Sequence, residues 1–525
     1  MTRSRIHWFL IIVILIFVAT ITLPFIIAGL NSGADYVFGG FLLNPIDGNS
    51  YFAKMRQGWE GGWHFTLPYT AESSDGVYLF LFYILLGHLS RITGLSIPIT
   101  FHTIRVSSSI LMLISLYYFY KSVLDTKTQL KIAYLLAVFG SGFGWLAMMF
   151  GGYTSDFWVA EAYPFLSAYA NPHFPLGLAV LLLIFTLAQN SLSINGLNKS
   201  ITRRISVFIG SILLGIVMPF GVVVALLVLG SIGILGIAKG YHQNNNHRLS
   251  RLPEEVILSV FVCLGGGPIL LYYYWISHTD PLLSAWNMQN LTLAPPFWDF
   301  LISFLPVLAF GILGIIHAVR CRLNSSTILI VWAVLGILLI WVPFNLQRRF
   351  MFGLYIPLAG LASIGFVSLF KESRYLRFAV LVTMLMLACL TNLIVVLAAF
   401  EGIKSLDSAI YITQGESQAF EWLLKNTEKE SVILTGPDTG LFVPAYTGRR
   451  VLYGHPYETV NADYQKKKVI DFIRDPNGEN SLEVFETSDY IFWGPREDEL
   501  ALESFRFNFA MVYETQEVLI YKITK

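Results

Sequence analysis

An aspartate in a stretch of polar and aromatic residues is the first candidate for chemistry. Asp47 lies in "NPIDGNSYFAKMRQGWEGGW", residues 44–63, directly after the first long apolar run. Aspartate before glycine is common in turns, so a structural role in a turn or helix cap is one interpretation. The other is chemical, because a carboxylate can deprotonate a hydroxyl group as a general base or hold a divalent cation such as Mg²⁺ or Mn²⁺.

A second polar stretch adds two carboxylates and a histidine. The sequence "GGYTSDFWVAEAYPFLSAYANPHFPLG" contains Asp156, Glu161 and His173. Two acidic loops on one face of a protein can converge on a single site, so Asp47, Asp156 and Glu161 are the predicted catalytic residues. His173 follows a proline at an expected helix start, where it is either a structural residue of the turn or a hydrogen-bonding group for a phosphate or sugar.

Two adjacent arginines, Arg348 and Arg349, stand in "WVPFNLQRRFMFGLYIPLAG" at the end of an apolar run. Guanidinium groups bind phosphate oxygens through paired, charge-assisted hydrogen bonds, which predicts a phosphate-binding role. The alternative is that the arginine pair extends to lipid headgroups, since long basic side chains do this readily. Lys54, Arg56 and Arg105 are weaker candidates for the same phosphate.

Aromatic and amide side chains predict where a sugar could bind. The stretch "SHTDPLLSAWNMQNLTLAPPFW" carries Trp286, Asn287 and Gln289, and Tyr51 lies in the same segment as Asp47. Aromatic faces and amide groups suit sugar recognition. These four residues, together with His173, are the predicted substrate-binding set.

The composition identifies the class of protein that must position these residues. Of 525 residues, 55% are hydrophobic and only 13% are charged, which indicates a polytopic membrane protein. The 35 lysines and arginines nearly balance 34 acidic residues, so nothing predicts a nucleic-acid partner. Three cysteines without paired spacing suggest neither a disulfide framework nor a zinc site.

Apolar runs of spanning length predict about eleven transmembrane helices. The run over 205–238 is too long for one crossing, and Pro219 marks the break between two short helices. The stretch 76–95 is expected to lie at the outer interface or to re-enter the membrane instead of crossing it. The other runs are near 8–29, 98–120, 131–150, 173–190, 255–275, 300–319, 326–344, 350–370 and 378–400.

Basic residues fix the expected orientation, because they concentrate in cytoplasmic loops. Arg3 and Arg5 predict a cytoplasmic N-terminus in a plasma (inner) membrane, and the later basic loops agree with eleven crossings. This orientation makes 30–97 the first external loop and 151–172 the second.

The chain is predicted to have two parts, a transmembrane domain over 1–400 and an extracytoplasmic α/β domain over 401–525. In the second part, "SQAFEWLLKNT" has helical spacing, while "SVILTG", "YIFWG" and "EVLIYKI" are short runs of β-forming residues. This pattern predicts a mixed sheet with flanking helices. The stretch "GPDTGLFVPAYTGRRVLYGHPYET" with His455 and Glu458 matches no nucleotide-binding fingerprint. It is either a set of turns with a solvated face, or a segment that recognises the acceptor or covers the membrane site as a lid.

This layout resembles the GT-C superfamily of integral-membrane glycosyltransferases, including mannosyltransferase-like and aminoarabinose-transferase-like members. In that superfamily an acidic residue follows the first helix, as Asp47 does in "PIDGNSYFAKM", and further acidic residues lie in the second external loop, as Asp156 and Glu161 do. Several members carry paired acidic residues in the first loop, where this chain has Asp47 and Gly48.

The resemblance implies transfer of a sugar from a polyprenyl-phosphate donor to a glycan, lipid or protein acceptor at the outer face of the membrane. Asp47 is then the base, Arg348 or Arg349 stabilises the departing lipid phosphate, and the displacement inverts the anomeric centre. Two other classes stay open, a lipid or polysaccharide transporter and a non-catalytic assembly protein. Transporters usually carry ionisable residues in the middle of their helices, and such residues are almost absent here.

Overall fold

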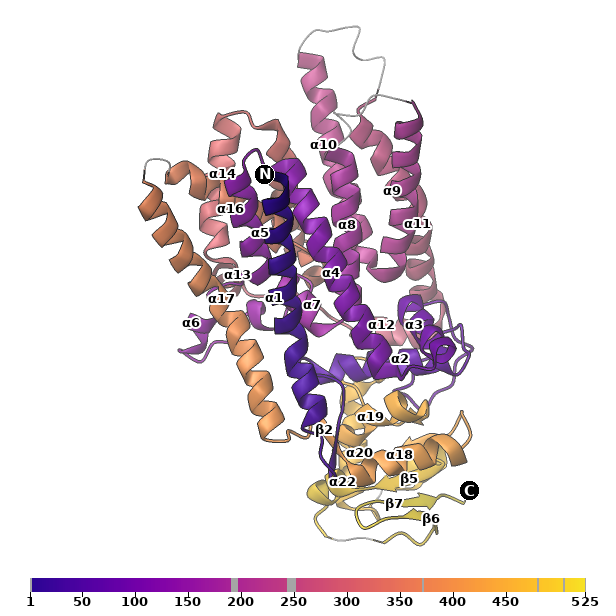
Figure 1. The fold of residues 1–525 in the computed structure, drawn as a ribbon. Coiled ribbons are helices and arrows are strands. Elements are labelled where there is room, and N and C mark those ends of the chain that lie inside the picture. Colours follow the sequence, from indigo (N-terminus) through magenta and orange to yellow (C-terminus); the bar gives the residue numbers. More distant parts are fainter. Residues whose placement is uncertain are drawn as a thin grey trace. The chain divides into compact units, whose positions relative to one another are not determined.

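The computed structural model describes residues 2–189, 197–242, 252–370, 373–478, 481–503 and 506–524. Helices dominate, and a small sheet follows near the C-terminus (Figure 1). The chain divides into two compact units. The first comprises Met1–Thr22, Thr103–Tyr272 and Thr292–Ala398, and the second comprises Leu23–His102, Tyr273–Leu291 and Ala399–Lys525.

The helices have these bounds: α1 (Thr2–Leu30), α2 (Pro45–Trp59), α3 (Leu81–Thr93), α4 (Ile97–Val123), α5 (Lys127–Phe139), α6 (Gly144–Met148), α7 (Pro164–Ala170), α8 (His173–Gln189), α9 (Leu197–Val217), α10 (Pro219–His242), α11 (Glu254–Thr279), α12 (Pro281–Gln289), α13 (Phe297–Phe304), α14 (Val307–Arg320), α15 (Thr327–Ile340), α16 (Tyr355–Leu369), α17 (Arg374–Lys404), α18 (Gln414–Asn426), α19 (Pro437–Thr447), α20 (Ala462–Arg474), α21 (Ser481–Thr487) and α22 (Pro495–Leu500). Short 3-10 turns lie at Ser155–Phe157, Asn324–Ser326 and Gln347–Met351.

Seven of the described helices are long and apolar enough to cross a membrane, or eight if the bent pair α13–α14 is one span. The predicted runs near 173–190, 326–344 and 350–370 correspond to apolar helices of fewer than 18 residues. The total of eleven crossings therefore stays a prediction. Helix α3 is too short to cross, as expected for 76–95, because its 13 residues extend only about 20 Å, against an apolar bilayer thickness of roughly 30 Å. Its position at the interface or within the membrane stays a prediction.

Breaks in the first unit follow proline and glycine. Helix α9 ends at Val217 and α10 begins at Pro219, as the sequence predicted. The run near 300–319 was expected to be one helix, but it bends by 79° between α13 and α14, where Leu305 and Pro306 interrupt it. The run near 131–150 is likewise interrupted, since α5 ends at Phe139 and α6 begins only at Gly144.

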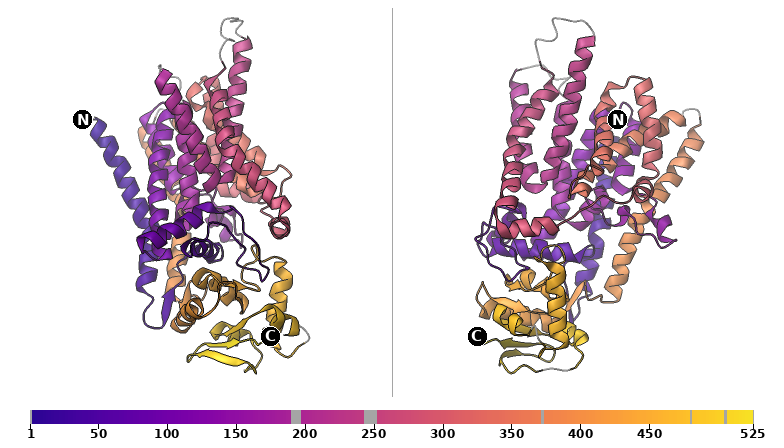
Figure 2. Two further views of the ribbon diagram at one scale, coloured as in Figure 1. Left: turned by 90° about the vertical axis from the view of Figure 1, so that its right-hand side faces the viewer. Right: turned by 180° about the vertical axis from the view of Figure 1, so that it is seen from behind.

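Small residues let the helices of the first unit approach closely. A Cβ atom added to Gly314 of α14 would lie 1.9 Å from the carbonyl oxygen of Leu361 in α16, and one added to Gly365 would lie 2.1 Å from that of Phe310. Close backbone approach at small residues is the usual packing of helices in lipid. Helices α8, α9 and α10 also pack side by side, as both views in Figure 2 show.

The second unit is built on a mixed five-stranded sheet in the order β4-β3-β5-β7-β6. Its strands are β3 (Val432–Leu434), β4 (Arg450–Val451), β5 (Tyr490–Trp493), β6 (Ala510–Glu514) and β7 (Leu519–Lys522). Strands β4, β3 and β5 are parallel, while β5 pairs with β7 and β7 with β6 in antiparallel fashion. The three strands and the helix predicted after residue 401 are therefore present.

Alternating side chains of this sheet form two cores. Ile433, Phe492 and Ile520 pack with residues of α18 and α19, whereas Leu434, Ile491 and Tyr521 pack with residues of α20 and α21. Successive strand residues point to opposite faces, so both faces of the sheet are covered by helices.

The segment after α1 belongs to the same unit as this sheet. Strand β1 (Tyr36–Phe38) pairs antiparallel with β2 (Tyr411–Thr413), and Ala53 and Tyr69 join the core of the sheet. Residues 30–97 were expected to belong to the transmembrane part. In the structure those residues, up to His102, pack with Ala399–Lys525 as one compact unit.

Candidate functional site

Asp47 lies in the first turn of α2. Asn44 caps the helix in a left-handed conformation, and its side-chain oxygen accepts the Asp47 backbone N–H at 3.3 Å. The Asn44 amide nitrogen donates to Asp47 Oδ2 at 2.6 Å. Asp47 thus takes part in a helix cap, as one interpretation predicted, while its side chain remains 45% exposed. The chemical interpretation stays a prediction.

The glycine after Asp47 has a steric reason. A Cβ atom added to Gly48 would lie 2.3 Å from the ring of Phe41, so no larger residue fits without displacing that ring. This contact explains why the chain has Asp–Gly where a pair of acidic residues was the alternative pattern.

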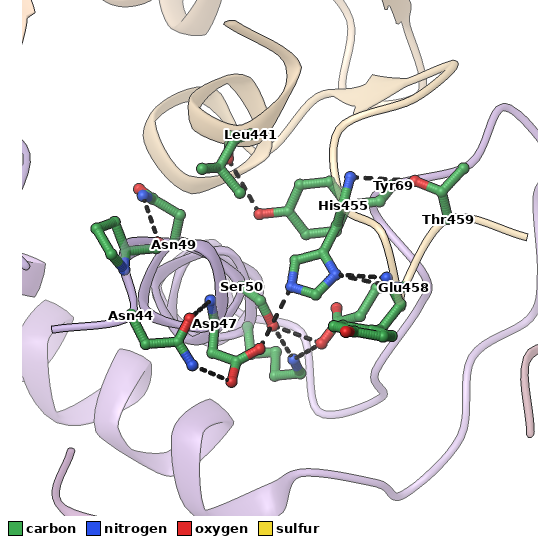
Figure 3. Close-up of polar contacts among 12 residues, drawn as sticks. Asn44, Asp47, Asn49, Ser50, Tyr69, Leu441, His455, Glu458 and Thr459 are labelled. Atoms are coloured by element: carbon green, nitrogen blue, oxygen red, sulfur yellow. Dashed lines mark hydrogen bonds and ion pairs between the residues drawn. The ribbon is translucent and has the colours of Figure 1, made fainter. Parts of the chain in front are cut away.

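A histidine of the C-terminal segment faces Asp47. His455 is 1% exposed, and its Nε2 atom lies 3.6 Å from Asp47 Oδ1 (Figure 3). Its Nδ1 atom accepts the backbone N–H groups of Tyr457 and Glu458, both at 3.1 Å. The ring is therefore held by its own loop on one side and directed at the carboxylate on the other.

Lys54, predicted as a phosphate-binding residue, is instead paired inside the protein. It is 1% exposed, and its Nζ atom lies 2.6 Å from Glu458 Oε1. Ser50 also contacts both groups. Burial alone would raise the pKa of Glu458, but Lys54 holds it below its ordinary value. In this arrangement the ammonium group binds a carboxylate and is not exposed to a phosphate.

Aromatic rings surround this ion pair. Lys54 Nζ lies 4.4 Å from the ring centre of Phe80 and 5.5 Å from that of Tyr51. Tyr51 stacks on Tyr83 with ring centres 4.4 Å apart. Tyr51, a predicted substrate-binding residue, thus lies one helical turn from Asp47 and on the aromatic side of Lys54.

The predicted sugar-binding residues of α12 belong to the second unit as well. Gln289 donates to the carbonyl oxygen of Thr459 and accepts the N–H of Asn461, so it holds the loop that carries His455. Trp286 packs near Phe80, with ring centres 6.3 Å apart, and its indole N–H has no hydrogen-bond partner among the described residues. Asn287 is half-buried on the same helix.

Asp156, in the first unit, is fully buried. Its carboxylate binds the backbone of the segment that separates α5 from α6. Its Oδ2 atom accepts the N–H groups of Gly142 at 3.1 Å and Gly144 at 2.9 Å, and its Oδ1 atom accepts the Thr154 hydroxyl at 2.7 Å. Burial raises the pKa of Asp156, while these hydrogen bonds oppose that shift. The carboxylate thus accepts backbone N–H groups that would donate to carbonyl oxygens in a continuous helix.

Asp299, which was not among the residues predicted from sequence, completes this cluster. It accepts the Ser155 N–H at 2.8 Å, and the Ser303 hydroxyl lies 2.6 Å from Asp299 and 3.2 Å from Asp156. A lone carboxylate in the apolar run "FWDFLISF" was the available signal, because such a residue needs buried partners.

Glu161 holds the arginine pair. Its Oε1 atom lies 3.3 Å from Arg348 Nε and 3.3 Å from Arg349 Nη1, and the glutamate side chain is only 4% exposed. The two arginine side chains are 21% and 30% exposed, and the Arg348 guanidinium lies 4.8 Å from the centre of the Trp158 ring. Two guanidinium groups thus contact the same carboxylate oxygen.

Arg105 and His173 both lie in the first unit. Arg105 is fully buried, and its guanidinium group donates to the carbonyl oxygens of Ile21 and Ala168. His173 begins α8, but the residue that caps this helix is Asn171, whose side chain accepts the N–H of Phe174. A phosphate or sugar contact of either residue stays a prediction.

Metal binding was left open by the sequence. Within the described parts of the chain, no group of three or more His, Cys, Asp and Glu side chains is arranged to hold a metal ion. In the cluster around Asp47, the Lys54 ammonium already neutralises the Glu458 carboxylate. Glu458 is thus already paired, and binding of Mg²⁺ or Mn²⁺ near Asp47 stays a prediction.

No protein-family model matches the chain, and no curated protein matches it in sequence. Solved structures do match. The apo archaeal oligosaccharyltransferase from Archaeoglobus fulgidus aligns with a TM-score of 0.59 and 13% identity, over 92% of this chain and 69% of that chain. ArnT from Cupriavidus metallidurans, bound to undecaprenyl phosphate, aligns with a TM-score of 0.53 and 10% identity, over 97% of this chain and 98% of that chain.

The chain has the GT-C fold. At these identities the likeness establishes the fold and not the activity. A further match is the archaeal oligosaccharyltransferase AglB in complex with an inhibitory peptide and a dolichol-phosphate, with a TM-score of 0.56 and 13% identity over 93% of this chain and 69% of that chain. Together with the helices of spanning length, the GT-C fold makes the chain a multi-pass membrane protein.

The GT-C layout indicates Asp47 from sequence, but His455 and the Lys54–Glu458 pair could not be assigned that way. Lys54 and Glu458 are 404 residues apart, and no spacing pattern connects them. The segment around His455 differs from its surroundings only in its glycines and charged residues, which do not indicate a partner. His455 and Glu458 lie three positions apart in a loop that contains Pro456, and nothing in this local sequence indicates that they contact Asp47 and Lys54.

Proposed function

We propose that the protein is a membrane glycosyltransferase that moves a sugar from a polyprenyl-phosphate-linked donor to a glycan, lipid or protein acceptor at the outer face of the membrane. Two proteins of the same fold have been solved with such lipids, AglB with a dolichol-phosphate and ArnT with undecaprenyl phosphate. The observation that carries the proposal is the half-exposed carboxylate of Asp47 at the start of α2. The N-terminus is cytoplasmic and the C-terminal domain extracytoplasmic in this proposal.

Asp47 is the general base. It removes the proton from the acceptor hydroxyl as that oxygen attacks the anomeric carbon, while the bond from this carbon to the phosphate oxygen breaks and its electron pair leaves with the lipid phosphate. Attack and departure take place on opposite faces of the sugar, so the anomeric configuration inverts. The first turn of a helix favours an ionised carboxylate, because the helix dipole places partial positive charge there.

Arg348 and Arg349 bind the donor phosphate. Both guanidinium groups lie 3.3 Å from their shared partner Glu161, which fixes them, and the two arginine side chains remain 21% and 30% exposed and therefore accessible to a phosphate. Guanidinium groups bind phosphate through two parallel hydrogen bonds, and this contact strengthens as charge develops on the leaving phosphate.

The test is transfer of labelled sugar by the full-length protein in lipid nanodiscs, with a panel of polyprenyl-phosphate sugars. Asp47→Asn is expected to lower kcat by about 100- to 10,000-fold with donor binding intact. Asp438→Asn is the matched control, because Asp438 is an exposed carboxylate in the first turn of α19. Unchanged transfer by Asp47→Asn would show that another group is the base.

The arginine pair is tested by donor binding. Arg348→Ala combined with Arg349→Ala is expected to weaken donor binding by about 10- to 100-fold, the loss of one to two charge-assisted contacts. Arg320→Ala with Arg322→Ala changes two exposed arginines of the same unit and is the control. Equal donor affinity in both double variants would refute the phosphate-binding role.

Stereochemistry and metal dependence are separate checks. NMR of the product is expected to show inversion at the anomeric carbon, and retention would exclude direct displacement. A requirement for Mg²⁺ or Mn²⁺ stays a prediction, measured as transfer in EDTA and after addition of either cation. If the wild type neither binds nor consumes any donor, the glycosyltransferase proposal is wrong and a transport or assembly role replaces it.

A further inference from the structure

The proton of the His455 ring is fixed by its loop. Nδ1 accepts the backbone N–H groups of Tyr457 and Glu458 at 3.1 Å, so this nitrogen carries no proton. A neutral imidazole then has its proton on Nε2. That atom has no hydrogen-bond partner among the described residues, although it is buried, and it faces Asp47 Oδ1 at 3.6 Å (Figure 3).

The Asp47 carboxylate is approached by one N–H donor at each oxygen. Oδ2 accepts from the Asn44 amide at 2.6 Å, and Oδ1 faces His455 Nε2. The second contact, at 3.6 Å, is longer than an N–H···O hydrogen bond of about 2.7–3.2 Å, so it is an electrostatic contact between the N–H group and the carboxylate oxygen. The two donors approach different oxygens and together restrict rotation of the carboxylate.

The surroundings keep the imidazole in place. The His455 backbone N–H donates to the Thr459 hydroxyl at 3.2 Å, and the Tyr69 ring lies against the imidazole with ring centres 5.4 Å apart. Glu458 of the same loop is bound to Lys54 of α2, the helix that carries Asp47. The loop is therefore attached to α2 by a buried ion pair, about two helical turns beyond the base.

We propose that His455 is a positioning residue for Asp47: its Nε2–H group orients the carboxylate for proton transfer from the acceptor. The inference rests on the proposed function, in which Asp47 is the base. His455 does not relay the proton, because protonation at Nδ1 would break two hydrogen bonds to the backbone. A residue of the C-terminal segment thus completes a base that stands near the start of the chain.

Two substitutions separate positioning of Asp47 from support of the loop. In His455→Gln the side-chain amide nitrogen reaches the place of Nε2, but the acceptor for the loop is lost. In His455→Asn the amide oxygen takes the place of Nδ1 and keeps the loop, but the donor to Asp47 is lost. The two variants therefore each remove one of the two functions of the His455 ring and keep the other.

We expect His455→Asn to lower kcat by about 10- to 100-fold, the usual effect of removing a group that supports a reacting residue, with KM for the donor within about twofold. His455→Gln is expected to retain most of the wild-type kcat. The reverse order, an active Asn variant and an inactive Gln variant, would show that His455 only supports the loop and would overturn the proposal.

A measurement without turnover distinguishes failure of this inference from failure of the proposed function. In protein labelled with ¹⁵N-histidine, the His455 signals are assigned by their loss in His455→Gln. We expect an Nε2-protonated ring whose signals shift in Asp47→Asn. Signals that are unchanged in Asp47→Asn, or an Nδ1-protonated ring, would refute the pairing whether or not the wild type transfers sugar.

Discussion

Asp156 in the first unit and Asp47 in the second were predicted for the same task, yet their surroundings differ. Asp156 is completely buried and accepts the backbone N–H groups of Gly142 and Gly144 together with a hydroxyl. Asp47 is 45% exposed, with Asn44 and His455 at its two oxygens. Both are acidic residues in polar stretches, so sequence alone treats them as equivalent.

The difference teaches which carboxylates maintain the fold and which can react. A buried carboxylate saturated with donors stabilises a backbone break, and removing it leaves those donors without partners. A half-exposed carboxylate with oriented donors contributes little to folding but can accept a proton from a bound molecule. Substitutions of the two kinds should therefore separate stability from activity.

The largest effect on stability is expected at the ion pair beside Asp47. Lys54→Met leaves Glu458 charged and buried without its partner, which costs about 3–5 kcal/mol. Thermal unfolding in nanodiscs should show a large decrease in the melting temperature. Lys425→Met is the control, because Lys425 forms a solvated pair with Glu421 that contributes less than about 1 kcal/mol. Equal melting temperatures in the two variants would contradict the structural role of the buried pair.

Asp156→Ala is expected to cost about 3 kcal/mol, because it leaves two glycine N–H groups and a hydroxyl without an acceptor. The folded fraction should retain transfer activity. Asp125→Ala, at an exposed carboxylate that accepts the Ser325 hydroxyl, should change the melting temperature little. Loss of activity in a variant that melts like the wild type would instead place Asp156 in the reaction.

Glu497 is the counterpart of Asp156 in the second unit, since its two oxygens accept the N–H groups of Gly436 and Gly494. Burial raises the pKa of Glu497 to about 7, against an ordinary value of 4.5. The folded state thus binds a proton more tightly than the unfolded state, and this stabilisation, about 3 kcal/mol, is complete below pH 4.5 and is lost as the pH rises through 7.

Melting temperatures between about pH 5 and pH 8 check this sign. The wild type should lose stability toward the alkaline end, and Glu497→Gln should lose that part of the pH dependence while being less stable at low pH. Glu499→Gln, at an exposed glutamate of the same helix, should behave like the wild type. A wild type that gains stability across this range would refute the raised pKa.

The smallest effect on stability is expected at Asp47 itself. Asp47→Ala removes one carboxylate from the first turn of α2, a loss of less than about 1 kcal/mol. Chemical or thermal unfolding should barely change, although transfer is abolished. A decrease comparable with that of Asp156→Ala would erase the distinction between the two carboxylates.

Local features of the fold could be predicted from the sequence. Pro219 ends one helix and begins another because its ring cannot continue the helix, and Val432–Leu434 forms a strand because β-branched and apolar residues stand between turns. The bend at Pro306 escaped prediction, because the apolar run continues on both sides of it. Apolarity indicates burial in lipid or protein but not the direction of the backbone.

The candidate site was predictable only in part. Asp47 and the arginine pair follow from residue type and position next to apolar runs. Their partners do not, because His455 and Glu161 meet them through folding of distant segments and a single sequence holds no signal for that pairing. The burial of Asp156 could not be predicted either, because the groups that bind its carboxylate are backbone N–H groups of Gly142 and Gly144, which every sequence provides.

The pairing of β1 with β2 has a consequence for synthesis of the protein. Tyr36–Phe38 finds its partner strand only at Tyr411–Thr413, roughly 370 residues later, which a ribosome adding about 5 to 20 residues per second reaches after about 20 to 75 s. During that interval Asp47 is already made, while His455 and Glu458 are not. The proposed base therefore meets His455 only after the C-terminal segment emerges, and a shorter, incomplete chain lacks this contact.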